Sequence, residues 1–173
     1  MRPTIFLSTP SILNLRQEQI YQRWNHAVNA RGFRVEQLQR RNYRTSPWKQ
    51  LGRLINNADG TLVLGLRQLI VNSGVWRPDT PEEIELSAAW TSPWMQIEAG
   101  MAIVSGIPVL VAPEAGVCEG VFARENWIGN VFGTSADEVD SAEVDAWASA
   151  VTAGVAATDG AHETAVGSGR NAT

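Results

Sequence analysis

The sequence predicts a three-layer, doubly wound α/β fold with a mostly parallel sheet. Short apolar runs alternate along the chain with segments whose apolar residues recur at helical spacing. Glycine, proline and serine bound many of these runs, which favours short buried strands. This alternation predicts parallel strands that are joined by crossover helices on both faces of one sheet.

Each element follows from local sequence signals. The expected strands cover residues 3–7, 33–38, 61–66 and 107–112, with a short fifth strand at Val131 and Phe132. The expected helices cover residues 15–31, 47–57, 93–105 and 142–155, and Gly32 and Gly106 end the first and third. Residues 68–90 contain Gly74, Pro78 and Pro81 and are interpreted as a long loop. Loops of this length are usually functional or mobile.

The length of 173 residues fits one domain that buries its own core. We expect a single nucleotide-binding α/β domain over residues 1–157. Alanine, threonine, glycine and serine dominate residues 158–173 without a period, which predicts a disordered tail.

Composition and charge exclude several function classes. The net charge of -4 argues against nucleic acid as a partner. The single cysteine, Cys118, excludes an internal disulfide and a multi-cysteine zinc site, and we expect neither a metal nor a cofactor. The only histidines in the sequence are His26 and His162, so a catalytic Ser-His-Asp or Cys-His arrangement is disfavoured. We expect a cytoplasmic protein without membrane contact, because the first 13 residues lack a signal-peptide pattern and no apolar run approaches about 20 residues.

Glu98 is the candidate for chemistry. Ser92 suits an N-cap and Pro93 the first helical position, so a helix begins there. At 100° per residue an apolar stripe runs along this helix, and Glu98 falls on its edge as a half-buried side chain. The stripe consists of Trp94, Ile97, Met101 and Val104. A carboxylate in that position meets a ligand or has its pKa raised by desolvation, whereas the alternative is a solvated glutamate at the helix margin.

In parallel α/β sheets, ligands bind beyond the carboxyl ends of the strands. This rule places residues 8–11, residues 39–46, the loop after Leu66 and the start of the Glu98 helix around one crevice. The candidate substrate-binding residues are Ser8, Thr9, Ser11, Tyr43, Arg44, Ser92 and Trp94. Tyr43 could stack on a base, and Arg44 belongs to a basic cluster that could hold a diphosphate or form a solvated face. Trp94 either lines the crevice or anchors its helix in the core, and its place on the apolar stripe favours the core.

Two family resemblances meet at Glu98. Residues 55–65, with Ala58-Asp59 before the strand, and the later Ser92-x-Trp94-x-x-x-Glu98 resemble the pattern of Toll/interleukin-1 receptor (TIR) domains. The start Ile5-Phe6-Leu7-Ser8 is similar to the first strand of that family. Ile97-Glu98-Ala99-Gly100-Met101-Ala102, followed by Gly106-Ile107-Pro108-Val109, resembles the nucleoside 2-deoxyribosyltransferases. Residues 114–122 match neither pattern, which suggests a bacterial branch with its own substrate.

These resemblances imply a flavodoxin-like or TIR-like layout and cleavage of the N-glycosidic bond of a nucleotide or nucleoside. In enzymatic TIR domains the glutamate assists cleavage of NAD, and in the transferases it is the nucleophile, so the resemblance gives Glu98 the catalytic role and makes NAD the leading substrate. The transferase pattern has an acidic residue where this chain has Ser92. TIR-like enzymes often complete their site across a subunit contact, which implies a homo-oligomer.

The chemistry supports the same reading of Glu98. Breaking an N-glycosidic bond develops oxocarbenium-like charge on the ribose, which a carboxylate stabilises or attacks. Nicotinamide in NAD already carries positive charge, so its departure needs no general acid. The alternative hypothesis is a non-catalytic module of the same fold that senses a nucleotide or assembles with copies of itself.

Overall fold

The computed structural model describes residues 2–38 and 47–167. Its main sheet has five strands in the order β2-β1-β3-β6-β7, and every neighbouring pair is parallel. The strands are β1 (Thr4–Ser8), β2 (Arg34–Glu36), β3 (Gly60–Gly65), β6 (Val109–Pro113) and β7 (Val131–Gly133). The parallel sheet that the sequence predicts is confirmed.

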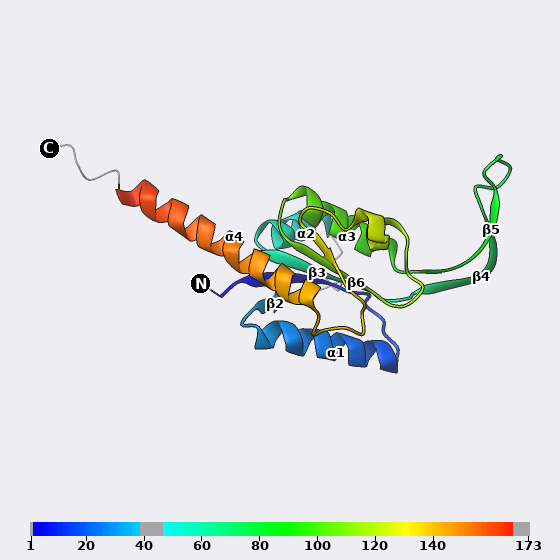
Figure 1. Cartoon of the computed structure of the whole chain (residues 1–173), viewed down its shortest axis with the longest axis horizontal. Coiled ribbons are helices and arrows are strands. Elements are labelled where there is room, and N and C mark those ends of the chain that lie inside the picture. The colour runs from blue at the N-terminus through cyan, green and yellow to red at the C-terminus, as the bar shows by residue number, and fades with distance from the viewer. Residues whose placement is uncertain (1, 39–46, 168–173) are drawn as a thin grey trace.

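Helices cover both faces of this sheet, which gives three layers (Figure 1). One face packs against α1 (Leu15–Ala30) and α4 (Ala142–Gly167), which contribute Trp24 and Trp147 to the core. The other face packs against α2 (Pro47–Asn56) and α3 (Pro93–Val104), which contribute Leu51 and Met95. Short 3-10 helices η2 (Gly120–Phe122) and η3 (Arg124–Asn126) follow β6.

Residues 68–90 are not the loop that the sequence predicts. They contain β4 (Leu69–Trp76) and β5 (Ile84–Trp90), which pair antiparallel as a separate two-stranded sheet. Apolar, largely β-branched and aromatic residues favour these strands, whereas Gly74 marks an irregularity in the pairing rather than a loop. The hairpin projects away from the three-layer body (Figure 1).

The final helix is also longer than expected. It continues to Gly167, although the loss of apolar periodicity predicts an end near Val155 and disorder after residue 157. Alanine recurs through this segment and has the highest helix propensity, which favours a helix here. The expected disorder of residues 168–173 lies outside the described residues.

The orientation of α3 differs from the expected one. Its buried residues are Met95, Glu98, Ala99 and Ala102. Two residues of the predicted apolar stripe instead lie toward solvent, with Ile97 40% and Val104 89% exposed, while Trp94 and Met101 are half-buried. Small Ala99 and Ala102 let the helix pack closely on the sheet. This rotation buries Glu98 more deeply than a position at the stripe's edge predicts.

Across the described part of the chain, no helix is both long and apolar enough to cross a membrane.

Candidate active site

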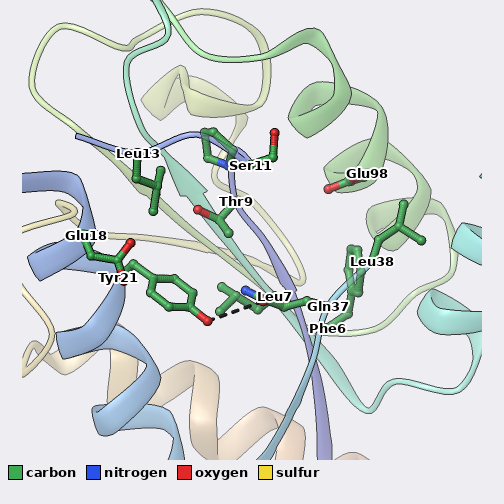
Figure 2. Close-up of a pocket in the computed structure, with 11 residues that line it drawn as sticks. Phe6, Leu7, Thr9, Ser11, Leu13, Glu18, Tyr21, Gln37, Leu38 and Glu98 are labelled. Atoms are coloured by element: carbon green, nitrogen blue, oxygen red, sulfur yellow. Dashed lines mark hydrogen bonds between the residues drawn. The ribbon is translucent and has the colours of Figure 1, made fainter. Parts of the chain in front are cut away.

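A pocket of about 580 Å³ opens at the carboxyl edge of the sheet (Figure 2). It lies where β1 and β2 end, beside the first turns of α1 and the inner face of α3. The side chains around it are Phe6, Leu7, Thr9, Pro10, Ser11, Leu13, Glu18, Tyr21, Gln37, Leu38 and Glu98. The crevice therefore forms where the topology of parallel sheets places ligand sites.

Glu98 borders this pocket from α3 and is 2% exposed. Ser92 is the N-cap of this helix, and its hydroxyl accepts a hydrogen bond from the Trp94 N–H at 3.4 Å. Ser8, the last residue of β1, is itself buried and donates a hydrogen bond from its Oγ to Glu98 Oε2. In Figure 2 the Glu98 carboxylate points toward the loop that carries Thr9 and Ser11. A strand end and a helix face thus hold one carboxylate at the pocket wall.

Two residues that line the pocket each carry a buried polar atom without a partner among the described residues. The hydroxyl of Thr9 and the amide nitrogen of Gln37 are buried, and neither hydrogen-bonds to another residue that the structure describes. The amide oxygen of Gln37 does accept a hydrogen bond from the Tyr21 hydroxyl at 3.4 Å, which orients the amide. Because buried polar atoms are normally paired, these two are suited to hydrogen-bond a polar ligand.

The described walls of the pocket carry negative charge only. Glu18 and Glu98 are its ionisable acids, and none of the described lining residues is lysine, arginine or histidine. Two carboxylates near one cavity favour a centre that gains positive charge. Among these side chains none would neutralise a phosphate.

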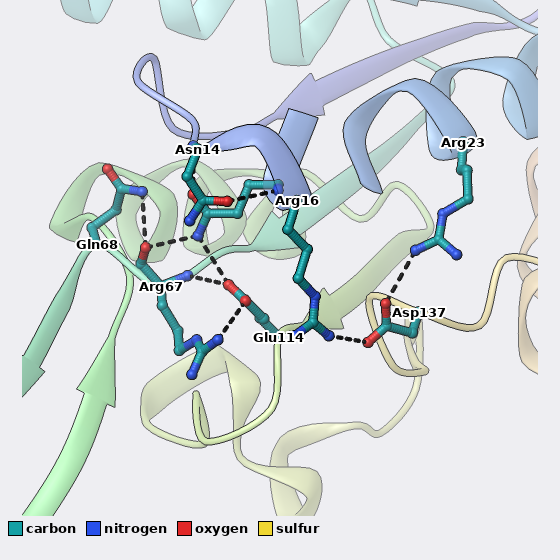
Figure 3. Close-up of polar contacts among 8 residues, drawn as sticks. Asn14, Arg16, Arg23, Arg67, Gln68, Glu114 and Asp137 are labelled. Carbon is teal, nitrogen blue, oxygen red and sulfur yellow. Dashed lines mark hydrogen bonds and ion pairs between the residues drawn. The ribbon is translucent and has the colours of Figure 1, made fainter. Parts of the chain in front are cut away.

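A second buried carboxylate, Glu114, lies at the end of β6 and has a different environment (Figure 3). The Arg67 guanidinium donates to its Oε1 at 2.8 Å, while the Arg67 backbone N–H and the Gln17 amide each donate to its Oε2 at 3.0 Å. Burial alone raises the pKa of Glu114, but the bonds from Arg67 and Gln17 and the charge of Arg67 together lower it. Glu114 therefore connects β3, β6 and α1. Both of its carboxylate oxygens already accept hydrogen bonds from protein groups.

The fold is similar to that of two solved bacterial enzymes. The CMP N-glycosidase BcmB of Clostridium botulinum superposes with a TM-score of 0.50 at 12% identity, over 83% of this chain and 97% of that one. The 2-deoxyribosyltransferase of Bacillus psychrosaccharolyticus gives a TM-score of 0.50 at 14% identity, over 83% of this chain and 95% of that one. This chain shares their fold. No protein-family model and no curated protein sequence matches it.

This similarity confirms the flavodoxin-like layout that the deoxyribosyltransferase resemblance implies. At such low identity it shows the fold alone. The roles of individual side chains in this chain therefore rest on the geometry of its own site.

The structure brings some of the predicted site residues together and separates others. Glu98, Thr9 and Ser11 line one pocket, and Ser8 lies directly behind Glu98. Ser92 caps α3 and does not line the pocket. Trp94 is half-buried rather than part of the core, and its ring packs on that of Trp48 with centroids 5.1 Å apart. Tyr43 and Arg44 lie outside the described residues.

Sequence reasoning missed Tyr21, Gln37 and the Glu114 network. Tyr21 and Gln37 reach the pocket because α1 packs beside the end of β2, which is a tertiary contact. For Gln37 a signal exists, since it is one of the last residues of the predicted strand 33–38 and so lies at the edge where parallel sheets bind ligands. For Glu114 the signal is its position directly after β6. In the described ranges no cluster of three or more histidine, cysteine or acidic residues could hold a metal ion.

Proposed function

We propose that this protein cleaves the N-glycosidic bond of a nucleoside or nucleotide, with Glu98 as the catalytic carboxylate. The observation that carries the proposal is a carboxylate, 2% exposed and hydrogen-bonded by Ser8, at the wall of a pocket of about 580 Å³. Its fold is that of two enzymes whose names describe an N-glycosidase and a deoxyribosyltransferase. This similarity supports the reaction class.

In the proposed reaction the bond between the anomeric carbon and the base nitrogen breaks, and its electron pair leaves with the base. The sugar carbon gains positive charge, which the Glu98 carboxylate stabilises or captures as a glycosyl ester. In a hydrolase, water then attacks this carbon and loses a proton, which the departed anionic base takes up, or which passes to solvent when neutral nicotinamide has left. In a transferase, the nitrogen of a second base attacks this carbon, and its proton passes to the departed base in the same way. Ser8 keeps the carboxylate oriented toward the reacting carbon.

The pocket supports a neutral or cationic group near Glu98 and polar contacts to Thr9 and Gln37. The described lining residues include no cation, so we place any phosphate of the substrate outside this part of the pocket. Tyr43 and Arg44 follow β2 in sequence, and we propose them as contacts to a base and a phosphate. NAD fits the same scheme, because its nicotinamide leaves without needing a proton.

The test incubates the purified protein separately with CMP, with 2′-deoxynucleosides and with NAD, and measures the released base by chromatography. Glu98→Gln keeps the side-chain shape and removes the charge, so base release should fall about a hundredfold or more. Glu119→Gln is the control, because it removes an equal charge from an exposed side chain. The assay is repeated at high protein concentration, since we expect a site shared between copies to require assembly.

Equal base release by wild type and Glu98→Gln would refute the catalytic role of Glu98. If no substrate loses its base while a nucleotide still binds, the non-catalytic sensing module is the better explanation. Nucleotide binding is measured separately by calorimetry, so that a loss of turnover is distinguished from a loss of binding.

A further inference from the structure

The β4–β5 hairpin is an arm with large apolar side chains in solvent. Leu69, Ile70, Val75, Trp76 and Ile84 are all exposed, and the last is 57% exposed. The rings of Trp76 and Trp90 stack with centroids 6.0 Å apart, but this pair does not cover the distal residues. An isolated two-stranded hairpin is only marginally stable in water. Packing on another surface would therefore stabilise the arm.

A second apolar surface lies on the outside of α2 and α3. It consists of Trp48, Trp94, Ile97 and Val104, and of these Val104 is 89% exposed. Trp94, Ile97 and Val104 share one face of α3, because they are three and seven residues apart. We call this group the outer α3 surface. From Trp94 to Val104 it extends about 15 Å at the rise of a helix, close to the length of four or five residues of strand.

The two surfaces carry opposite charge. Asp79, Glu82 and Glu83 lie at the tip of the hairpin, where Arg77 pairs with Glu82. Lys49 and Arg53 are exposed one turn apart on α2, next to Trp48, and neither forms an ion pair with another described residue. Complementary charge guides two surfaces into register.

We infer that two copies of this chain form a dimer by exchanging arms: the distal half of each hairpin packs on the outer α3 surface of the other copy. The hairpin projects away from its own body in Figure 1 and is therefore free to reach a neighbour. A second copy is the occupant that these observations favour, since each chain supplies both an acidic apolar arm and a basic apolar surface. Reciprocal exchange also closes the assembly at two copies.

The test measures the mass of the intact protein in solution by sedimentation equilibrium. Wild type should have twice the mass of one chain. Ile84→Asp on the arm and Val104→Asp on the outer α3 surface should each raise the dimer dissociation constant about a hundredfold or more. Both side chains are largely solvent-exposed in the single chain, so the variants should still fold, and circular dichroism checks this. Ile128→Asp, at a 73% exposed apolar residue outside both surfaces, is the control and should remain dimeric.

Mixing the two variants tests whether the arm of one copy packs on the outer α3 surface of the other. In a dimer of either variant alone, both arm-to-surface contacts carry a substitution. In a mixture, the intact arm of the Val104→Asp chain can pack on the intact outer α3 surface of the Ile84→Asp chain. A weaker dimer should therefore return. A wild-type monomer at high concentration would overturn the proposal. So would a dimer that Val104→Asp leaves unchanged, because the outer α3 surface would then not be the contact between the copies. These readouts report mass and not turnover, so they fail or succeed independently of the proposed reaction.

Discussion

Replacing Glu114 with glutamine should destabilise the fold, and the loss should depend on pH. The carboxylate is 2% exposed and accepts three hydrogen bonds, from the Arg67 guanidinium, the Arg67 backbone N–H and the Gln17 amide. A hydrogen bond to a charged group contributes about 1.5–3 kcal/mol, and glutamine keeps one accepting oxygen but faces a donor with its amide nitrogen. We therefore expect a loss of about 2–4 kcal/mol at neutral pH.

The pH dependence follows from the lowered pKa of Glu114. Burial opposes ionisation, but the hydrogen bonds from Arg67 and Gln17 and the charge of Arg67 outweigh it in the folded protein. In the unfolded chain a glutamate titrates near about 4.3. The carboxylate therefore stabilises the fold above that pH, and this contribution is lost as the pH falls through the lower folded pKa. The stability gap between wild type and Glu114→Gln should be largest at pH 6–8 and shrink below about pH 4.

Denaturant unfolding followed by tryptophan fluorescence measures this gap at both ends of the pH range. Glu119→Gln is the control, because it neutralises an exposed glutamate and should match wild type. A gap of equal size at pH 7 and pH 3.5 would show that the charge of Glu114 is not what stabilises the fold. If wild type and Glu114→Gln have the same free energy of unfolding at pH 7, the hydrogen bonds to Glu114 contribute nothing to stability.

Three further predictions concern the pocket and the sheet. Thr9→Val removes a buried hydroxyl that has no partner, so stability should be unchanged or slightly higher, while nucleoside affinity measured by calorimetry falls about tenfold. Ser8→Ala should lower kcat about 10- to 100-fold with little change in KM, and should have no further effect in a Glu98→Gln background, because Ser8 acts through Glu98. Gly65→Ala should lower the free energy of unfolding by about 1–3 kcal/mol, since a Cβ there would lie 2.5 Å from the buried Phe122 ring, whereas Gly52→Ala in open space should not.

Local sequence signals predict the sheet and the start of α3 because the required information is local. Short apolar runs that alternate with helices are typical of buried parallel strands, and this alternation places the carboxyl edge and the loop of Thr9 and Ser11. The Ser92-Pro93 pair sets the first turn of α3, so Glu98 falls at a fixed position in the helix. The sequence therefore also predicts a carboxylate of the pocket, Glu98.

The rotation of α3 could not be predicted in this way. Helical spacing shows that Trp94, Ile97 and Val104 share one face, but Ala99 and Ala102 form a competing face, and the gain from close packing against the sheet decides between them. The hairpin was missed for a related reason. Glycine and proline in residues 68–90 are also compatible with a loop, and only the pairing of two strands across the turn distinguishes them.

By itself the sequence determined the parallel α/β fold, the edge of the sheet at which the pocket opens and the carboxylate that borders this pocket, because periodicity, caps and chain order set all three. Tertiary structure alone decided that Ser8 contacts Glu98, that Tyr21 orients Gln37 and that Arg67 neutralises Glu114. Each of these contacts joins residues that no local pattern relates, and the energy of each depends on burial that exists only after the layers have packed.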